Sequence, residues 1–268
     1  MTGFGRRAAI LPALLLAAIV LTGQQPPGLT ITSSSPPTDI NGAKENQNFD
    51  VEWRLIPAGT AKLSWKPILG STVAASEARL HLESTGIVSR LFRVNDDYTA
   101  MLGQNFCGGG TFMAAREGSR NKETRVTYDQ QARHAKYIEK DLVKNTVVNQ
   151  EVDTPPCVHD VLGGLIVLRS LRLEPGKTVQ IPISDGKKAA QVKIEAQRRE
   201  DIVTPLGTFQ TVRYEVFLFD NVIYKRSAHV HVWLTDDNVR MPVQVQVRLQ
   251  FAIGTITFKL AKEERLPL

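Results

Sequence analysis

Cys157, His159 and Asp160 place a thiol, an imidazole and a carboxylate within one four-residue stretch. A cysteine nucleophile uses these three groups, but they must converge in space, which adjacency along a chain does not deliver. Cys107 is the other cysteine of the chain, and an even number of cysteines in an oxidising compartment indicates a disulfide. We therefore expect no catalytic residue here and a Cys107–Cys157 disulfide, which would constrain the unfolded chain by about 4 kcal/mol in the chain-entropy model.

His229 and His231 stand two residues apart in a strand-like segment, so both imidazoles would point to one face. Such a pair could share a metal ion, but no third potential ligand lies at a spacing typical of metal sites. We expect two imidazoles on the polar face of a strand and predict no metal site.

Two acidic pairs, Asp96-Asp97 and Asp236-Asp237, stand in turn-like contexts, where an aspartate bonds its own backbone. The run Gly108–Gly110 lacks the strand-to-helix frame and the lysine of a phosphate loop, so we expect a mobile turn. The motifs G-x-S-x-G and H-E-x-x-H and the calcium-loop pattern do not occur in the sequence. The chain is therefore expected to be noncatalytic and to need no cofactor.

The first 23 residues have the layout of a secretory signal peptide. Two arginines precede an apolar run over residues 8–21, and Thr22-Gly23 supplies small residues at the expected cut. An uncleaved anchor helix is the alternative, but Pro12 and an apolar length of roughly 14 residues favour cleavage. No cysteine stands near the run, which argues against a lipoprotein anchor. We expect a periplasmic or secreted protein.

Residues 24–46 are rich in Pro, Ser and Thr and read as a flexible tether, and residues 47–268 as a single domain. The net charge is +6, but an exported chain meets little nucleic acid, so no nucleic-acid partner is expected. The positive charge has one denser patch, formed by Arg116, Arg120, Lys122, Arg125, Arg133 and Lys136. This patch is either a solvated strand face or a surface that meets anionic lipid headgroups or an acidic envelope protein.

Most of the domain alternates apolar and polar residues with the period of β-strands, most regularly over residues 243–251. Short turns join these segments, which indicates antiparallel pairing. We predict an all-β fold in which a curled sheet of about 11–12 strands forms a closed or half-open barrel.

Residues 153–173 break this pattern and predict one helix packed on or in the barrel, capped by Asp153 or Thr154. Gly163-Gly164 in its middle implies a close approach to a strand or to a ligand, and we favour a strand.

Four blocks of sequence, in this order, resemble the exported bacterial family called domain of unknown function 3108. The blocks are IPAGTAKLSW, DTPPCVHDVLGGLIVLRSL, DIVTPLGTFQTVRYEV and VWLTDDNVRMPVQVQV. The likeness covers about Phe49 to Leu260, with Gly163-Gly164 as a departure, and it implies no established activity. A weaker likeness, of the turn from Trp233 to Pro242, is to LolA/LolB-type lipoprotein carriers, which implies a curved sheet holding acyl chains under a helical lid.

Trp53, Trp65, Phe209, Phe217 and Trp233 are the candidates to line an apolar cavity, although they could instead fill a narrow core. Our first hypothesis is a noncatalytic exported envelope protein that binds a lipid or a lipoprotein acyl chain in a barrel cavity. The alternative is a structural or interaction module that binds a partner protein through a sheet edge or the basic face.

Overall fold

The computed structural model describes residues 43–68, 75–103, 106–249 and 254–267. The predicted signal peptide (1–23) and most of the predicted tether (24–46) lie outside these residues. The first strand begins at Ala43, before the predicted domain start at residue 47. Glu45 is buried in this strand, so residues 43–46 belong to the folded domain and not to the tether.

Fourteen antiparallel strands form one sheet, and two short helices accompany it in the described part of the chain. The strands are β1 (Ala43–Trp53), β2 (Ile56–Pro67), β3 (Ser76–Ser84), β4 (Asn95–Leu102), β5 (Gly108–Glu117), β6 (Arg120–Asp129), β7 (His134–Asp141), β8 (Thr146–Asp153), β9 (Thr178–Ser184), β10 (Ala189–Thr204), β11 (Gly207–Val216), β12 (Ala228–Thr235), β13 (Pro242–Leu249) and β14 (Thr255–Pro267). The helices are α2 (Gly86–Leu91) and α3 (Val161–Ser170).

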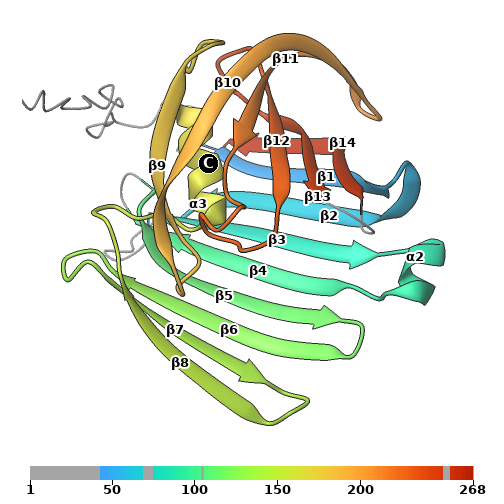
Figure 1. Ribbon diagram of the computed structural model, residues 1–268. Helices are drawn as coiled ribbons and strands as arrows, with labels where there is room; N and C mark the ends of the chain where they lie inside the picture. The colour runs from blue at the N-terminus through green and yellow to red at the C-terminus, as the bar shows by residue number, and fades with distance from the viewer. Residues whose placement is uncertain (1–42, 69–74, 104–105, 250–253, 268) are drawn as a thin grey trace, which may run out of the picture.

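The sheet is a meander whose first and last strands pair with each other. β1 pairs with β14 in the middle of the sheet, and β8 and β9 are its two edges. The sheet curls without closing, and α3, which connects the two edge strands, lies within the curl (Figure 1). The prediction of an all-β, half-open barrel with one packed helix is therefore confirmed.

The sheet has more strands than the 11–12 predicted, chiefly because the sequence interpretation omits β5. The predicted mobile turn at Gly108–Gly110 is wrong, since these glycines open that strand. Gly108 has no room for a side chain, because a Cβ at this position would lie 2.9 Å from the ring of Tyr128 on β6. Asp96 and Asp97 likewise lie in a strand, β4, and not in a turn.

The α3 helix begins later than predicted, because Asp160, and not Asp153 or Thr154, is its N-cap. The residues before the cap are held extended against β9: the His159 N–H donates to Pro182 O at 2.9 Å, and the Ser184 N–H donates to His159 O at 2.9 Å. A Cβ on Gly164 would lie 2.5 Å from Ile183 Cδ1, so this glycine permits close packing on β9, the alternative that the sequence favoured.

The predicted Cys107–Cys157 disulfide is present. It joins the segment before β5 to the segment that leads into α3, and the Gly108 N–H donates to Val158 O at 2.8 Å beside it. Cys157 therefore carries no free thiol, which removes the nucleophile interpretation of this stretch.

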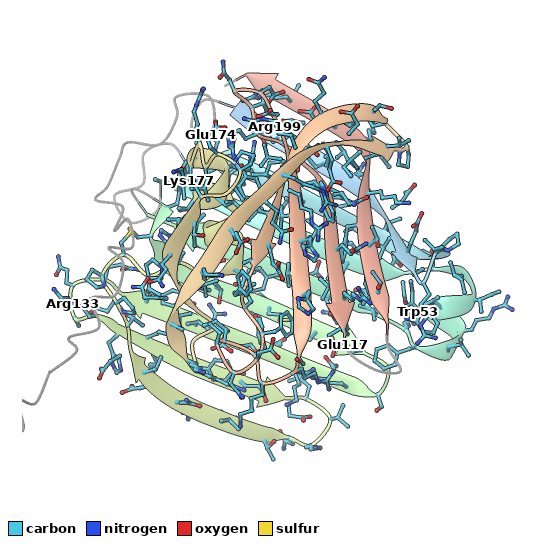
Figure 2. All side chains as sticks on the ribbon, turned by 45° about the horizontal axis from the view of Figure 1, so that its top comes forward. Trp53, Glu117, Arg133, Glu174, Lys177 and Arg199 are labelled. Atoms are coloured by element: carbon cyan, nitrogen blue, oxygen red, sulfur yellow. A yellow bond between two sulfur atoms is a disulfide. The ribbon has the colours of Figure 1, made fainter. Side chains whose placement is uncertain are left out.

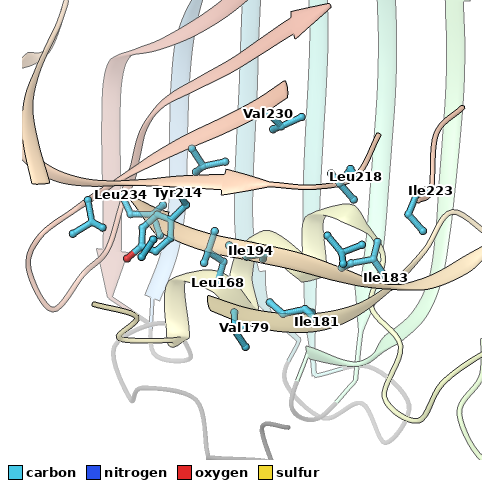
Figure 3. Close-up of a cluster of buried hydrophobic side chains, with 14 residues drawn as sticks. Leu168, Val179, Ile181, Ile183, Ile194, Tyr214, Leu218, Ile223, Val230 and Leu234 are labelled. Atoms are coloured by element: carbon cyan, nitrogen blue, oxygen red, sulfur yellow. The ribbon is translucent and has the colours of Figure 1, made fainter. Parts of the chain in front are cut away.

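The largest apolar cluster lies between α3 and the strands β9 to β12. Figure 3 shows Leu168 of α3 beside Ile194, with Ile181 and Tyr214 on either side. These strand residues point to the concave face because strand side chains alternate between faces. The helix is therefore packed mainly on the C-terminal half of the sheet.

The disulfide gives a direct test of how the helix segment is anchored. Replacing both cysteines, in Cys107→Ser/Cys157→Ser, should lower the free energy of unfolding by about 4 kcal/mol and the melting temperature by roughly 10 °C. Thermal melts of the oxidised protein and of the variant measure the difference. A reducing agent should lower the melting temperature of the parent protein but not that of the variant; equal melting temperatures in all four samples would contradict the expectation.

Candidate functional site: an apolar cavity beneath a pinned helix

A cavity of about 200 Å³ lies between α3 and the concave face of the sheet. Its walls come from α3, from β1 to β3 and from β9 to β14, and every lining residue is apolar or glycine. Leu165 and Leu168 of α3 face Val232, Val245 and other strand residues across it. For comparison, an apolar cavity of about 150 Å³ in a protein core binds benzene. The space therefore suits a hydrocarbon group and offers no polar group for chemistry.

The concave face becomes more exposed toward one end of the sheet. Phe49 on β1 lines the cavity and is buried, Val51 and Trp53 further along the same face are half-buried, and Leu55 in the next turn is 84% exposed. Val51 pairs with the cavity-lining Phe258, which places it on the inner face. The apolar interior thus continues to the end of the sheet that carries the β1–β2 turn, which we call the open end.

A buried ion pair fixes the C-terminal part of α3 toward the other end. Arg169 is 1% exposed and donates two hydrogen bonds to Glu45 on β1, at 2.9 and 3.1 Å. Its Nε also donates to the Arg240 carbonyl oxygen at 3.1 Å, and Arg265 lies 3.6 Å from Glu45. The helix is therefore tied to the first strand and to the β12–β13 turn.

The Asp160 carboxylate fixes the N-terminal end of α3. It is fully buried and accepts hydrogen bonds from the Leu162 and Gly163 N–H groups at 2.8 and 3.2 Å and from the Tyr98 hydroxyl at 3.3 Å. Burial outweighs these bonds and raises the pKa of Asp160 to about 6. His159 beside it is also buried, and burial lowers the pKa of its imidazole.

None of the five aromatic residues singled out in the sequence lines this cavity. Trp53 lies on the inner face at the open end, in register with Ile256, and Arg54 stacks over its ring. Trp65 is buried, packs edge-on against Phe106 at 5.5 Å between ring centres, and borders a smaller second cavity beside Arg169.

The other three aromatic residues pack elsewhere. Trp233 lies on the outer face, where its indole N–H donates to Glu200 at 2.8 Å, and Phe209 packs in the same apolar cluster. Phe217 stacks under Lys193, whose Nζ lies 4.1 Å from the ring centre. The cavity walls are instead aliphatic, and the signal for them in the sequence was the alternation of valines along β12 and β13 and the apolar stripe of the helix.

His229 and His231 lie on one face of β12, and Val230 and Val232 point to the opposite face, into the cavity. Both rings approach Glu215, at 2.9 and 3.9 Å. No cluster of three or more His, Cys, Asp or Glu side chains that could hold a metal ion occurs among the described residues.

Asp237 stabilises its own turn, as expected from the sequence: its carboxylate accepts hydrogen bonds from the Val239 and Arg240 N–H groups, both at 2.9 Å.

In the part of the chain that the structure describes, no helix has the length and apolarity needed to cross a membrane.

The Arg169–Glu45 pair can be tested by removing one charge or both. Arg169→Met should lower the free energy of unfolding by about 3–5 kcal/mol, because it leaves the Glu45 carboxylate buried without its main partner. The double variant Arg169→Met/Glu45→Met should recover most of that loss in urea unfolding. Arg199→Met, which removes two surface ion pairs, with Glu174 and with Asp236, is the control and should change stability little. Equal losses in the single and double variants would argue against a coupled pair.

The raised pKa of Asp160 predicts in which direction the stability of the fold changes with pH. An unfolded aspartate titrates at about 3.9, so between pH 4 and 6 the folded state binds the extra proton and stability falls as pH rises. Asp160→Asn keeps a good N-cap without the charge. Relative to the parent, the variant should gain about 2 kcal/mol in free energy of unfolding between pH 4 and pH 7. A difference that stays constant over this range would show that the carboxylate is not destabilised by burial.

A solved structure shares this architecture. A crystal structure of a β-barrel-like protein of domain of unknown function 1849 from Brucella abortus matches with a TM-score of 0.52 and 9% identity, covering 84% of this chain and 98% of that chain. This likeness shows a shared fold alone. A protein with a YmcC-like fold from Bacteroides fragilis matches with a TM-score of 0.32 and 11% identity, over 82% of this chain and 95% of that chain.

A search of the curated proteins found no match to this chain. The family model described as protein of unknown function DUF3108 matches residues 48–261, which span the sheet from β1 to β14 and include the helix that covers the cavity. The chain therefore belongs to the DUF3108 family.

Proposed function

We propose that this protein is a noncatalytic, exported binding protein that holds an apolar group, such as a lipid or lipoprotein acyl chain, in the cavity beneath α3. The cavity with its wholly apolar lining is the observation that carries this proposal. Binding would come from removing hydrocarbon from water, at about 0.8 kcal/mol for each buried methylene. The site would select for apolarity and size and not for a particular polar group.

The two anchors of α3 support this function. A helix held at its start by Asp160 and near its end by Arg169 cannot collapse onto the opposite strands, so space remains beneath it. The disulfide fixes the same segment and persists best in an oxidising compartment. This agrees with the signal peptide predicted at residues 1–23, and together they favour the periplasm or the exterior as the place of action.

A second candidate function, a partner-binding module, rests on the edge strand β8. This strand pairs with β7 alone and is exposed along nearly its whole length, including Val147 and Val148. An exposed edge can accept a further strand from a partner chain. The cavity is the more specific feature, so we place lipid binding first.

The proposal predicts saturable binding of a fatty acid at one site. Titration of the delipidated protein with the fluorescent fatty acid cis-parinaric acid should give one bound molecule per chain, and native mass spectrometry should show the corresponding adduct. Val245→Trp places a large side chain in the cavity wall and should weaken binding at least tenfold. Val203→Trp, at an exposed position outside the cavity, is the matched control and should bind like the parent.

Thermal melts establish that both variants fold. A clean mass after incubation with the fatty acid, or equal affinities in folded Val245→Trp and Val203→Trp, would contradict binding in this cavity. Either result would favour the edge-strand module, whose interaction should survive in Val245→Trp.

A further inference from the structure

Strands β1 to β8 contribute four connections to the open end: the β1–β2 turn (54–56), the β3–β4 connection with α2 (86–93), the β5–β6 turn (118–120) and the β7–β8 turn (142–145). Because the sheet is antiparallel, the β9–β10 turn (185–188) and the β11–β12 connection (217–227) lie at the same end of the sheet. Backbone hydrogen bonds link neighbouring connections into one surface. The Thr85 N–H donates to Ala58 O at 2.9 Å, and the Gly118 N–H donates to Arg93 O at 2.7 Å. The Leu142 N–H donates to Asn121 O at 2.9 Å, which joins the last connection to the β5–β6 hairpin.

Large apolar side chains project from this surface into solvent. Leu55 and Leu91 are 84% and 73% exposed, and the others that project are Ile56, Ile87, Phe92, Leu142 and Val143. These seven come from three of the four connections. Apolar side chains gathered in this way on a protein surface mark a site of interaction.

The charge of the same surface is mainly positive. The four connections contain five basic residues, Arg54, Arg90, Arg93, Arg120 and Lys144, while the acidic Glu117 and Asp141 flank two of them, and Glu117 pairs with Arg120 at 2.8 Å. The connections 185–188 and 217–227 add four basic residues, Lys187, Lys188, Lys225 and Arg226, and two acidic ones, Asp185 and Asp220. Figure 2 shows the separation of the two ends, with Trp53 and Glu117 on one side and Arg133 and Lys177 on the other.

We propose that the open end docks on an anionic lipid membrane. Exposed leucine and phenylalanine side chains would enter the headgroup region while arginines and lysine meet lipid phosphates, the combination by which peripheral proteins bind such surfaces. The side chains stand on projecting turns and not in a groove, which suits a deformable lipid surface. Docking would bring the half-buried inner face at Val51 and Trp53, which continues along β1 to the cavity-lining Phe49, to the acyl chains. This last consequence rests on the proposed function, whereas docking itself does not.

Co-sedimentation with vesicles tests the proposal. The disulfide-bonded protein should bind vesicles of phosphatidylglycerol and phosphatidylcholine, bind pure phosphatidylcholine at least tenfold more weakly, and lose affinity as salt rises. Leu55→Asn/Leu91→Ser should weaken binding to anionic vesicles about tenfold; asparagine tolerates the left-handed backbone at residue 55, where φ is 67°. Arg90→Glu/Arg93→Glu should remove most of the salt dependence.

Two control variants lie away from the open end. Val203→Ser removes an apolar side chain that is 71% exposed, and Lys177→Glu reverses an exposed charge. Both should bind anionic vesicles within twofold of the parent protein. No binding to anionic vesicles, or equal losses in the control and open-end variants, would overturn the proposal.

Docking and ligand binding can be tested independently of each other. Leu55→Asn/Leu91→Ser should still bind cis-parinaric acid when no vesicles are present, because neither residue lines the cavity. Vesicle binding without fatty-acid binding would leave docking standing and refute the cavity function. Fatty-acid binding without vesicle binding would do the reverse.

Discussion

The buried ion pair between Arg169 and Glu45 is the contact on which the arrangement of this molecule depends. It joins residues 124 positions apart and ties α3 to the first strand of the sheet. The sheet does not close between β8 and β9, so the helix that connects them is needed to cover the interior. A charge pair in this position fixes where the helix lies while its apolar side chains pack on β9 to β12. The helix is thus held at both ends by polar contacts, and an apolar cavity lies between it and the strands.

The two ends of the barrel differ in a way that follows from this anchoring. Toward one end the helix, the disulfide-linked segment and the ion pair cover the concave face. Toward the other end the β11–β12 connection (217–227) buries Leu218 and Ile223 in the core, while inner side chains such as Val51 are half-buried. The same open end carries basic turns with projecting leucines. An apolar interior, its half-buried continuation along β1 and a surface suited to lipid therefore lie along one direction of the molecule, which is why we interpret them together.

Sequence reasoning predicted the features that depend on local pattern. Alternation of apolar and polar residues predicted the strands β12 and β13, and two cysteines predicted the disulfide. It failed where contacts between residues far apart in the sequence determine the structure. Glu45 looks like part of a polar tether until Arg169 is placed beside it, and Gly108 looks like a turn until Tyr128 crowds the strand. The aromatic residues were the natural candidates for a cavity, yet Trp233 faces outward because Glu200 accepts its indole N–H.

The central claim is that an acyl chain enters the space beneath α3, and nuclear magnetic resonance of methyl groups measures this directly. A stearic acid with a nitroxide near its terminal methyl group should broaden the methyl resonances of Leu165 and Val232, which line the cavity, and spare those of Val203, which does not. Unlabelled stearic acid should restore the broadened signals by competition. Broadening confined to exposed methyl groups, with Leu165 and Val232 unaffected, would contradict the account.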